Sequence, residues 1–313
     1  MNLNDIKHVM VVGAGTMGHS IAQVYGTAGY EVDLVDLSQE TLDHAIKLIR
    51  SNLETLAEFN RVSIENIPSI IKRINTTTNL GDVAPKADLV IEAVYEDLKI
   101  KGEIFSQLDK FCSENAILAS NTSGLDVFRV AKVKNLERVV IHHWFAPPHI
   151  IPLVEVVKGR KTSPEIIDFS VKLLEKLGKQ PIVMNKFARS FIVNKIQSSI
   201  SVAVYELLMR KLATPEQIDL AVKTSLGIRL PIVGVVQTQD FTGLDLVVDV
   251  ARSLGKENPL VQEMVDRGDL GAKSGKGFYD YGGRSEEEIL RKRDKLYLQM
   301  LDHLEKTKAF ERI

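Results

Sequence analysis

The sequence predicts an α/β protein, in which a doubly wound, mostly parallel sheet is followed by an all-α C-terminal domain. Near the start, a glycine-rich turn joins an apolar run to a helix-like segment. Short apolar runs then alternate with helical patterns as far as residue 184, which is typical of a parallel sheet covered on both faces. From Phe191 onward only helical patterns remain. We therefore expect two domains, residues 1–186 and 187–313, with the boundary near Lys186.

The glycine-rich turn spans residues 13–18 and reads Gly-Ala-Gly-Thr-Met-Gly. In this arrangement the first glycine makes a tight turn, the second lets a pyrophosphate approach the backbone, and the third lets the helix pack on the strand. The helix start also offers free N–H groups to phosphates. The turn therefore predicts a Rossmann-type, dinucleotide-binding domain. The expected cofactor contacts in it are Gly13, Gly15, Thr16, Met17 and Gly18.

Asp36 ends the second apolar run, 32–35, and predicts which dinucleotide binds. A carboxylate at this place accepts hydrogen bonds from the adenosine ribose hydroxyls. It also repels a 2′-phosphate. We therefore expect NAD rather than NADP as the cofactor.

The remaining elements follow from periodicity and from capping residues. Ser38 is a suitable N-cap for the helix after the second strand, and Gly178 is placed to end a later one. In the C-terminal part, Thr214 and Pro215 fit a helix start. The segment 192–208 is apolar nearly all round, with more apolar surface than a small domain can cover, so we expect a homodimer. Further strands are expected at 74–78, 88–94, 117–120, 138–142, 153–157 and 180–184, and further helices at 97–111, 165–177 and 286–308.

The composition excludes several classes of protein. Hydrophobic residues make up 44% and charged residues 26% of the 313 residues, and the net charge is −1. This balance gives no electrostatic basis for binding nucleic acid or an anionic membrane. No apolar run approaches the length of a bilayer, and the polar start does not resemble a signal peptide. The single cysteine, Cys112, permits no internal disulfide, so we expect a cytoplasmic protein.

The densest group of polar and aromatic residues lies between residues 141 and 157. His143 falls where a strand meets a loop, and Glu155 lies within the aliphatic run 153–157. A carboxylate there is costly to bury without a partner, and a histidine is the obvious one. Such a pair makes the imidazole a suitable general base. The alternative of a metal site is less favoured, because His142 and His143 are adjacent on a strand and point to opposite faces.

Over essentially its whole length the chain resembles the L-3-hydroxyacyl-CoA dehydrogenase family. The resemblance rests on His143 with Phe145 and Pro147, together with seven matching stretches. These are residues 11–18, 89–94, 119–125, 152–157, 191–194, 241–245 and 273–281. It implies reversible, NAD-dependent oxidation of an (S)-3-hydroxyacyl-CoA to the 3-oxoacyl-CoA, in fatty acid metabolism.

The resemblance also assigns roles to individual residues. His143 is implied to be the base that removes the hydroxyl proton, with Glu155 orienting it. Ser123 and Asn194 are implied to hydrogen-bond the substrate oxygen. The positions implied to lie near the cofactor are Glu96, Lys101, Ser123 and Lys276.

Two departures from the family pattern concern the substrate. Ala146 stands where the family usually has asparagine, and the stretch 230–237 differs throughout. The segment between the second strand and residue 78, where family members hold part of coenzyme A, has few cations. An alternative is therefore a dehydrogenase of a free hydroxy acid or another small polar alcohol, in a pocket lined by His149, Arg229 and Gln237. A third hypothesis is that the chain is a non-catalytic relative, retained as a structural or binding protein. An intact pair of His143 and Glu155 argues against it.

Overall fold

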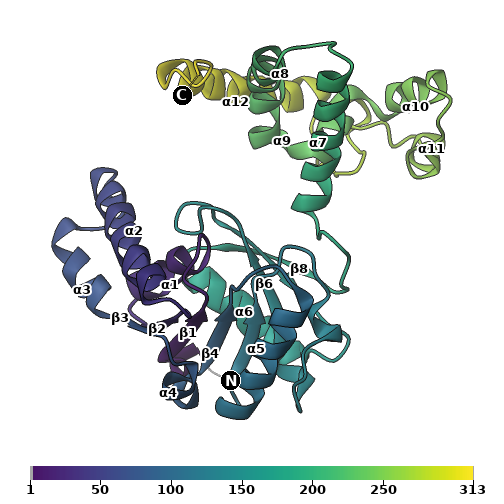
Figure 1. The fold of residues 1–313 in the computed structure, drawn as a ribbon. Helices are drawn as coiled ribbons and strands as arrows, with labels where there is room; N and C mark the ends of the chain where they lie inside the picture. The colour runs from purple at the N-terminus through teal and green to yellow at the C-terminus, as the bar shows by residue number, and fades with distance from the viewer. Residues whose placement is uncertain (1–2, 313) are drawn as a thin grey trace. The chain divides into compact units, whose positions relative to one another are not determined.

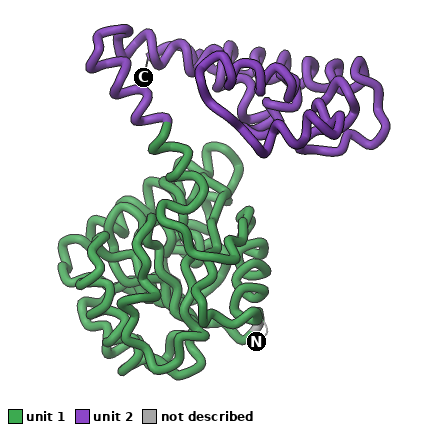
Figure 2. The backbone as a smooth tube through the Cα atoms, turned by 90° about the vertical axis from the view of Figure 1, so that its right-hand side faces the viewer, with its two compact units in different colours: residues 1–199 green, residues 200–313 purple. Residues whose placement is uncertain are grey.

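The structure is a computed structural model, and it describes residues 3–312 (Figure 1). These residues fall into two compact units, which divide between Ser199 and Ile200 (Figure 2). The dividing point lies inside the helix α7 (Val193–Met209), so the first turns of that helix belong to the first unit.

The first unit is built on one eight-stranded sheet with the order β3-β2-β1-β4-β5-β6-β7-β8. All neighbouring strands are parallel except β6 and β7, which are antiparallel. The strands are β1 (His8–Val12), β2 (Glu31–Val35), β3 (Ile74–Thr77), β4 (Leu89–Glu92), β5 (Ile117–Ser120), β6 (Val139–Trp144), β7 (Leu153–Val157) and β8 (Gln180–Met184). The predicted doubly wound, mostly parallel sheet is confirmed.

Helices cover both faces of this sheet and form two separate cores (Figure 1). One core includes Ile21 of α1 (Gly18–Thr27), Leu42 of α2 (Gln39–Glu58) and Leu173 of α6 (Pro164–Lys176). The other includes Phe105 of α5 (Leu98–Phe111). The α-helices of this unit are α1 (Gly18–Thr27), α2 (Gln39–Glu58), α3 (Ile67–Lys72), α4 (Leu80–Val83), α5 (Leu98–Phe111) and α6 (Pro164–Lys176). Its 3₁₀ turns are η1 (Leu3–Asp5), η2 (Ile64–Asn66), η3 (Ala84–Lys86), η4 (Val127–Arg129) and η5 (Leu136–Arg138).

The predicted capping residues explain where these helices begin and end. The Ser38 hydroxyl accepts a hydrogen bond from the N–H of Thr41 at the start of α2. Beyond the end of α6, Gly178 has a φ of 73°, a left-handed value that glycine adopts without steric cost.

The second unit is helical, as predicted. The Thr214 side chain closes a capping box at the start of α8, and Ser285 does the same for α12. Leu244, Val248 and Val261 lie in a small buried core. Its elements are α7 (Val193–Met209), which begins in the first unit, α8 (Pro215–Ala221), the π-helical turn η6 (Val222–Leu226), α9 (Gly227–Thr242), α10 (Leu244–Ser253), α11 (Pro259–Asp266), η7 (Ala272–Ser274) and α12 (Glu286–Lys306).

Across residues 3–312, none of the helices combines the length and the apolar character needed to cross a bilayer.

Candidate active site

His143 and Glu155 stand directly opposite each other on the antiparallel strands β6 and β7. Residues in such a pair project from the same face of the sheet. The imidazole Nδ1 lies 2.7 Å from a carboxylate oxygen of Glu155, and both side chains are buried. Because a carboxylate only accepts, Nδ1 carries the proton and donates it. In the neutral imidazole the other ring nitrogen, Nε2, then presents a lone pair, which is the state that a general base requires.

The second oxygen of Glu155 holds the start of α7. It accepts hydrogen bonds from the N–H groups of Ile192 and Val193, each at 3.0 Å. Burial raises the pKa of this carboxyl group, but the hydrogen bonds from His143 and from the two N–H groups outweigh it, so the pKa is lowered overall. Glu155 is therefore an anion that orients the imidazole and anchors the helix carrying Asn194.

Aromatic rings enclose the His143 imidazole. The ring centroid of Phe145 lies 4.5 Å from that of His143, and the centroid of Phe191 lies 5.3 Å away. These apolar walls restrict the rotation of the imidazole and keep water from much of its surface.

Ser123 is held by Glu96 and Asn194. The Ser123 hydroxyl donates to Oε1 of Glu96 at 2.8 Å, and the Ser123 N–H donates to the same oxygen at 2.7 Å. The Asn194 side-chain amide donates to the carbonyl of Ser123 at 3.1 Å. Burial raises the pKa of Glu96, but the hydrogen bonds from Thr122 and Ser123 and the nearby Lys101 ammonium outweigh it, so the pKa is lowered overall. The structure thus brings together Ser123, Glu96 and Asn194, three of the residues singled out in the sequence.

Lys101 lies inside the protein, where two carboxylates neutralise it. Its side chain is 1% exposed, and its ammonium lies 2.7 Å from Glu92 and 3.3 Å from Glu96. Glu92 also accepts a hydrogen bond from the Ser120 hydroxyl at 2.6 Å. Glu92 and Ser120 were missed in the sequence reasoning. The available signal was a carboxylate at the end of the apolar run 89–92, which needs a partner for the same reason as Glu155.

The glycine-rich turn has the geometry that its sequence predicts. Gly13 has a φ of 101°, and a Cβ atom there would lie 2.6 Å from the carbonyl oxygen of Ala93. A Cβ on Gly18 would lie 1.7 Å from the carbonyl oxygen of Gly13, so α1 can approach β1 only without a side chain. Apart from Gly15 and its two neighbours in the chain, none of the described residues has an atom within 4 Å of the place where a Gly15 Cβ would be. That space remains open for a ligand against the backbone.

A pocket of about 880 Å³ adjoins this turn. It is lined by Gly13, Gly15, Thr16, Met17 and Asp36, together with apolar and polar residues of α4 and α5. Its volume is within the range of cofactor and ligand sites. A glycine turn at a helix start beside a pocket at the carboxyl ends of the strands fits a dinucleotide.

Asp36 closes one side of this pocket. One of its carboxylate oxygens accepts a hydrogen bond from the N–H of Ala14 at 2.8 Å, and the other accepts one from Ser38 at 3.2 Å. The carboxylate therefore stays fixed between the glycine turn and the start of α2. Leu37, which follows it, has an exposed and uncharged side chain, so this position offers no cation to a 2′-phosphate.

The other predicted residues make contacts within their own units. Ser20 of α1 holds His149, with 2.7 Å between the hydroxyl oxygen and Nδ1, and Lys276 lies 3.3 Å from Asp269 in the second unit. Arg229 donates to Ser225, also in the second unit. The pocket predicted from His149, Arg229 and Gln237 draws on residues of both units, so neither unit alone contains it.

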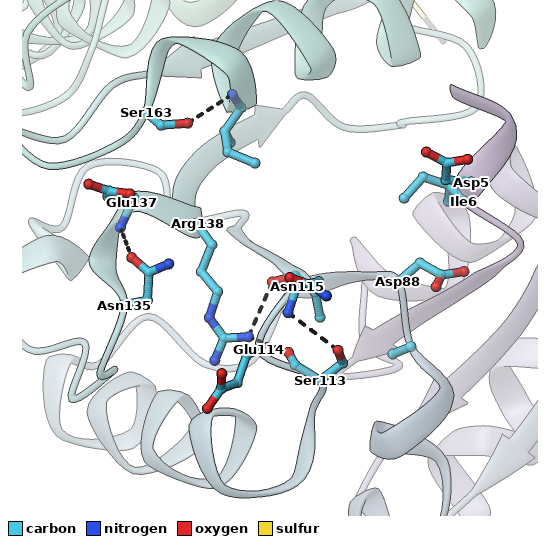
Figure 3. Close-up of a pocket in the computed structure, with 13 residues that line it drawn as sticks. Asp5, Ile6, Asp88, Ser113, Glu114, Asn115, Asn135, Glu137, Arg138 and Ser163 are labelled. Carbon is cyan, nitrogen blue, oxygen red and sulfur yellow. Dashed lines mark hydrogen bonds between the residues drawn. The ribbon is translucent and has the colours of Figure 1, made fainter. Parts of the chain in front are cut away.

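A different pocket, of about 480 Å³, lies at the amino ends of the strands (Figure 3). Arg138 forms part of it and donates to the carbonyl of Ser113 at 2.5 Å and to Asp109 at 3.0 Å. In open α/β sheets ligands bind at the carboxyl ends of the strands, where His143 and Glu92 lie. The Arg138 pocket is therefore separate from the candidate site. Within residues 3–312, no three histidine, cysteine or carboxylate side chains are placed to share a metal ion.

Comparison with known proteins gives two family matches. The family described as 3-hydroxyacyl-CoA dehydrogenase, NAD binding domain, matches residues 8–187. The family described as 3-hydroxyacyl-CoA dehydrogenase, C-terminal domain, matches residues 191–281. Together these matches cover most of the chain.

Three individual proteins illustrate the similarity. A probable 3-hydroxybutyryl-CoA dehydrogenase of Bacillus subtilis is 38% identical over 287 residues, which cover 88% of this chain and 98% of that protein. The crystal structure of a 3-hydroxyacyl-CoA dehydrogenase from Archaeoglobus fulgidus matches with a TM-score of 0.79 and 28% identity, covering 95% of this chain and 99% of that one. The 5-formyl-3-hydroxy-2-methylpyridine 4-carboxylate 5-dehydrogenase of Mesorhizobium japonicum is 29% identical over 284 residues, covering 88% of this chain and 91% of that protein.

Proposed function

Because this chain belongs to the 3-hydroxyacyl-CoA dehydrogenase family of NAD-dependent oxidoreductases, we propose that it oxidises (S)-3-hydroxyacyl-CoA reversibly to the 3-oxoacyl-CoA, with His143 as the general base. The observation that carries the proposal is the hydrogen bond between His143 and the buried carboxylate of Glu155. This pairing leaves the lone pair of Nε2 ready to take a proton from a hydroxyl group.

The chain's own residues hold and deprotonate the alcohol. His143 Nε2 accepts the hydroxyl proton, and the negative charge of Glu155 stabilises the imidazolium that forms. Ser123 and Asn194, already in contact through the Ser123 carbonyl, are the proposed hydrogen-bond partners of the substrate oxygen. Asn194 has a second amide N–H to donate, whereas the Ser123 hydroxyl, which donates to Glu96, would have to turn from Glu96 to the substrate. Bound NAD would supply the acceptor for the hydride that leaves the substrate carbon. In the reverse direction the imidazolium returns its proton to the reduced oxygen.

The proposed cofactor contacts fall into two groups. The turn at Gly13–Gly18 would bind the pyrophosphate through backbone N–H groups, and Asp36 would bind the adenosine ribose. Glu96, Lys101, Ser123 and Lys276 are the further proposed contacts. For Lys101 the role is indirect, since its buried ammonium fixes Glu96 and, through it, Ser123.

A direct assay tests the proposal. Purified protein is given NAD with (S)-3-hydroxybutyryl-CoA, and in parallel with free (S)-3-hydroxybutyrate, and NADH formation is followed by absorbance. We expect a much higher kcat/KM for the thioester. Equal rates on both compounds, or activity on the free acid alone, would reject the acyl-CoA substrate.

The second candidate function is oxidation of a free hydroxy acid or another small polar alcohol without coenzyme A. Ala146, which is exposed directly after the His143 segment, favours it, because an alanine offers no side-chain hydrogen bond to a substrate. The similarity to the Mesorhizobium enzyme, whose name states a pyridine carboxylate substrate, also favours it. The free-acid arm of the assay distinguishes the two functions.

We also propose a domain boundary near Lys186, a homodimer and a cytoplasmic location. The boundary is supported by the gap between the two family matches, at residues 188–190. Residues 193–199 pack with the first unit because Glu155 and Ser123 bind the first turn of α7. The dimer is supported by the absence of buried residues along α7, in which Val202 is 68% exposed. The location is supported by the single, buried Cys112.

A further inference from the structure

β6 extends beyond its neighbour β5 at the point where it carries the base. The parallel ladder between the two strands ends with the pairing of Ser120 and Ile141. β6 continues to Trp144, and its last residues pair only with β7. His143 therefore lies on a strand end that has a neighbouring strand on one side only.

The side chain of Asn121 provides the hydrogen-bond acceptor that a neighbouring strand would otherwise offer to the end of β6. Its Oδ1 accepts a hydrogen bond from the N–H of Trp144 at 2.9 Å. Its own N–H donates to the carbonyl of Glu92 at 2.7 Å, which fixes it against β4. Trp144 is 1% exposed, so few waters could serve its N–H if the amide oxygen were absent.

We infer that Asn121 is a positioning residue for His143. It ties the end of β6 to the loop that carries Ser123, two residues further along the chain. Glu155 orients the imidazole from the β7 side, and Asn121 sets the backbone from the β5 side. The distance between His143 and Ser123 then depends on the side-chain amide of Asn121. The inference rests on the proposed role of His143 as the base.

Three variants separate the acceptor atom from the rest of the side chain. Asn121→Ala removes the oxygen that binds Trp144. Asn121→Asp keeps an oxygen at the same place and has nearly the same shape. Asn135→Ala is the matched control, since the Asn135 oxygen also accepts a backbone N–H, that of Glu137, at the opposite end of the strands.

The kinetic expectation is a loss in kcat with NAD binding intact. A displacement of the base by a fraction of an ångström in Asn121→Ala lowers kcat about 10- to 100-fold. The affinity for NAD, measured by calorimetry, stays at the wild-type value. Asn121→Asp recovers most of kcat, and Asn135→Ala retains all of it. Wild-type kcat in Asn121→Ala, or Asn121→Asp as impaired as Asn121→Ala, would overturn the inference.

A measurement without substrate keeps this test independent of the proposed function. The NMR signal of the His143 ring is assigned by its loss in His143→Gln. It should move in Asn121→Ala and stay in place in Asn121→Asp and Asn135→Ala. An unmoved His143 signal in Asn121→Ala rejects the positioning role, even if the wild-type protein is active in the dehydrogenase assay. If the signal moves in Asn121→Ala but the wild-type protein oxidises no hydroxyacyl substrate, the proposed function is rejected instead. If Asn121→Ala does not fold, the test uses Asn121→Asp alone. We expect the His143 signal of that variant to match the wild-type signal, and a displaced signal would overturn the inference.

Discussion

Glu155 binds the imidazole of His143 with one carboxylate oxygen and the first N–H groups of α7 with the other. One buried anion therefore sets the tautomer of the proposed base and the place of the helix that carries Asn194. The proposed base and the proposed substrate contact Asn194, which come from two segments of the chain, therefore share this single support. Changes at Glu155 should consequently affect both catalysis and stability.

Replacing the proposed base is the most direct test of the mechanism. In His143→Gln the amide cannot take a proton, so we expect kcat to fall by about 10²- to 10⁴-fold. NAD binding, which depends on the separate pocket around Gly13 and Asp36, should be unchanged in calorimetry. Turnover near the wild-type value would show that another group removes the proton.

Glu155→Gln should impair catalysis and alter the response to acid. The amide no longer stabilises the imidazolium, so kcat should drop by about 10²-fold and the pH profile of kcat/KM should shift. The folded-state pKa of Glu155 lies below its ordinary value, so its charge stabilises the protein above about pH 4.5. That contribution is lost as the pH falls further. Chemical unfolding from pH 7 to pH 3 should therefore show a weaker acid dependence in the variant, and identical curves would contradict the assignment.

Cofactor choice can be tested at Asp36 without disturbing the glycine turn. Asp36→Asn removes the charge that repels a 2′-phosphate but keeps an oxygen for the N–H of Ala14. We expect the ratio of kcat/KM for NAD over NADP to fall by about tenfold or more. Asp36→Ala should lower activity with both cofactors, because it also frees that N–H. A wild-type protein that uses NADP as well as NAD would refute the prediction.

Local sequence patterns were enough to predict the fold and the central pair of the site. Apolar runs, capping residues and the glycine turn are properties of neighbouring residues, and they gave the strands, the helices and the cofactor pocket. His143 and Glu155 were paired because a lone carboxylate in an aliphatic strand requires a partner, and the two lie 12 residues apart.

The contacts that the sequence did not reveal depend on strands brought together from distant segments. The Ser120 hydroxyl meets Glu92 across 28 positions, and Asn121 meets Trp144 across 23. Neither contact produces a periodic pattern in the sequence, because each depends on where one strand ends relative to its neighbour. The pairing of Ser20 with His149, 129 positions apart, is of the same kind.

The proposed homodimer predicts a change in mass from one substitution. Val202, Tyr205 and Met209 of α7 are 68%, 62% and 77% exposed, an apolar surface suited to a second copy. We expect wild-type protein to sediment as a dimer and Val202→Glu to sediment as a monomer. Val250→Glu on α10, where the valine is 50% exposed, is the matched control and should remain a dimer. A wild-type monomer would exclude this assembly.

His142 predicts an acid-sensitive stability that is independent of catalysis. Its ring is fully buried, and neither nitrogen has a hydrogen-bond partner among the described residues. Burial lowers its pKa from 6.5 to about 3. Below pH 6.5 the unfolded chain takes up a proton that the folded protein does not. The free energy of unfolding should therefore decrease by up to about 1.4 kcal/mol per pH unit until the pH approaches 3.

His142→Leu removes both the unpaired nitrogens and the proton uptake. At pH 7 we expect the variant to be more stable by about 1–3 kcal/mol, since two buried polar atoms without partners are replaced by apolar ones of similar volume. Its stability should also decline less steeply between pH 6.5 and pH 3. The exposed His303→Leu is the control, and it is not expected to reproduce the change seen in His142→Leu. The free energy of unfolding is measured in urea at each pH. If it changes with pH equally in His142→Leu and in wild type, His142 is protonated, or hydrated, inside the folded protein.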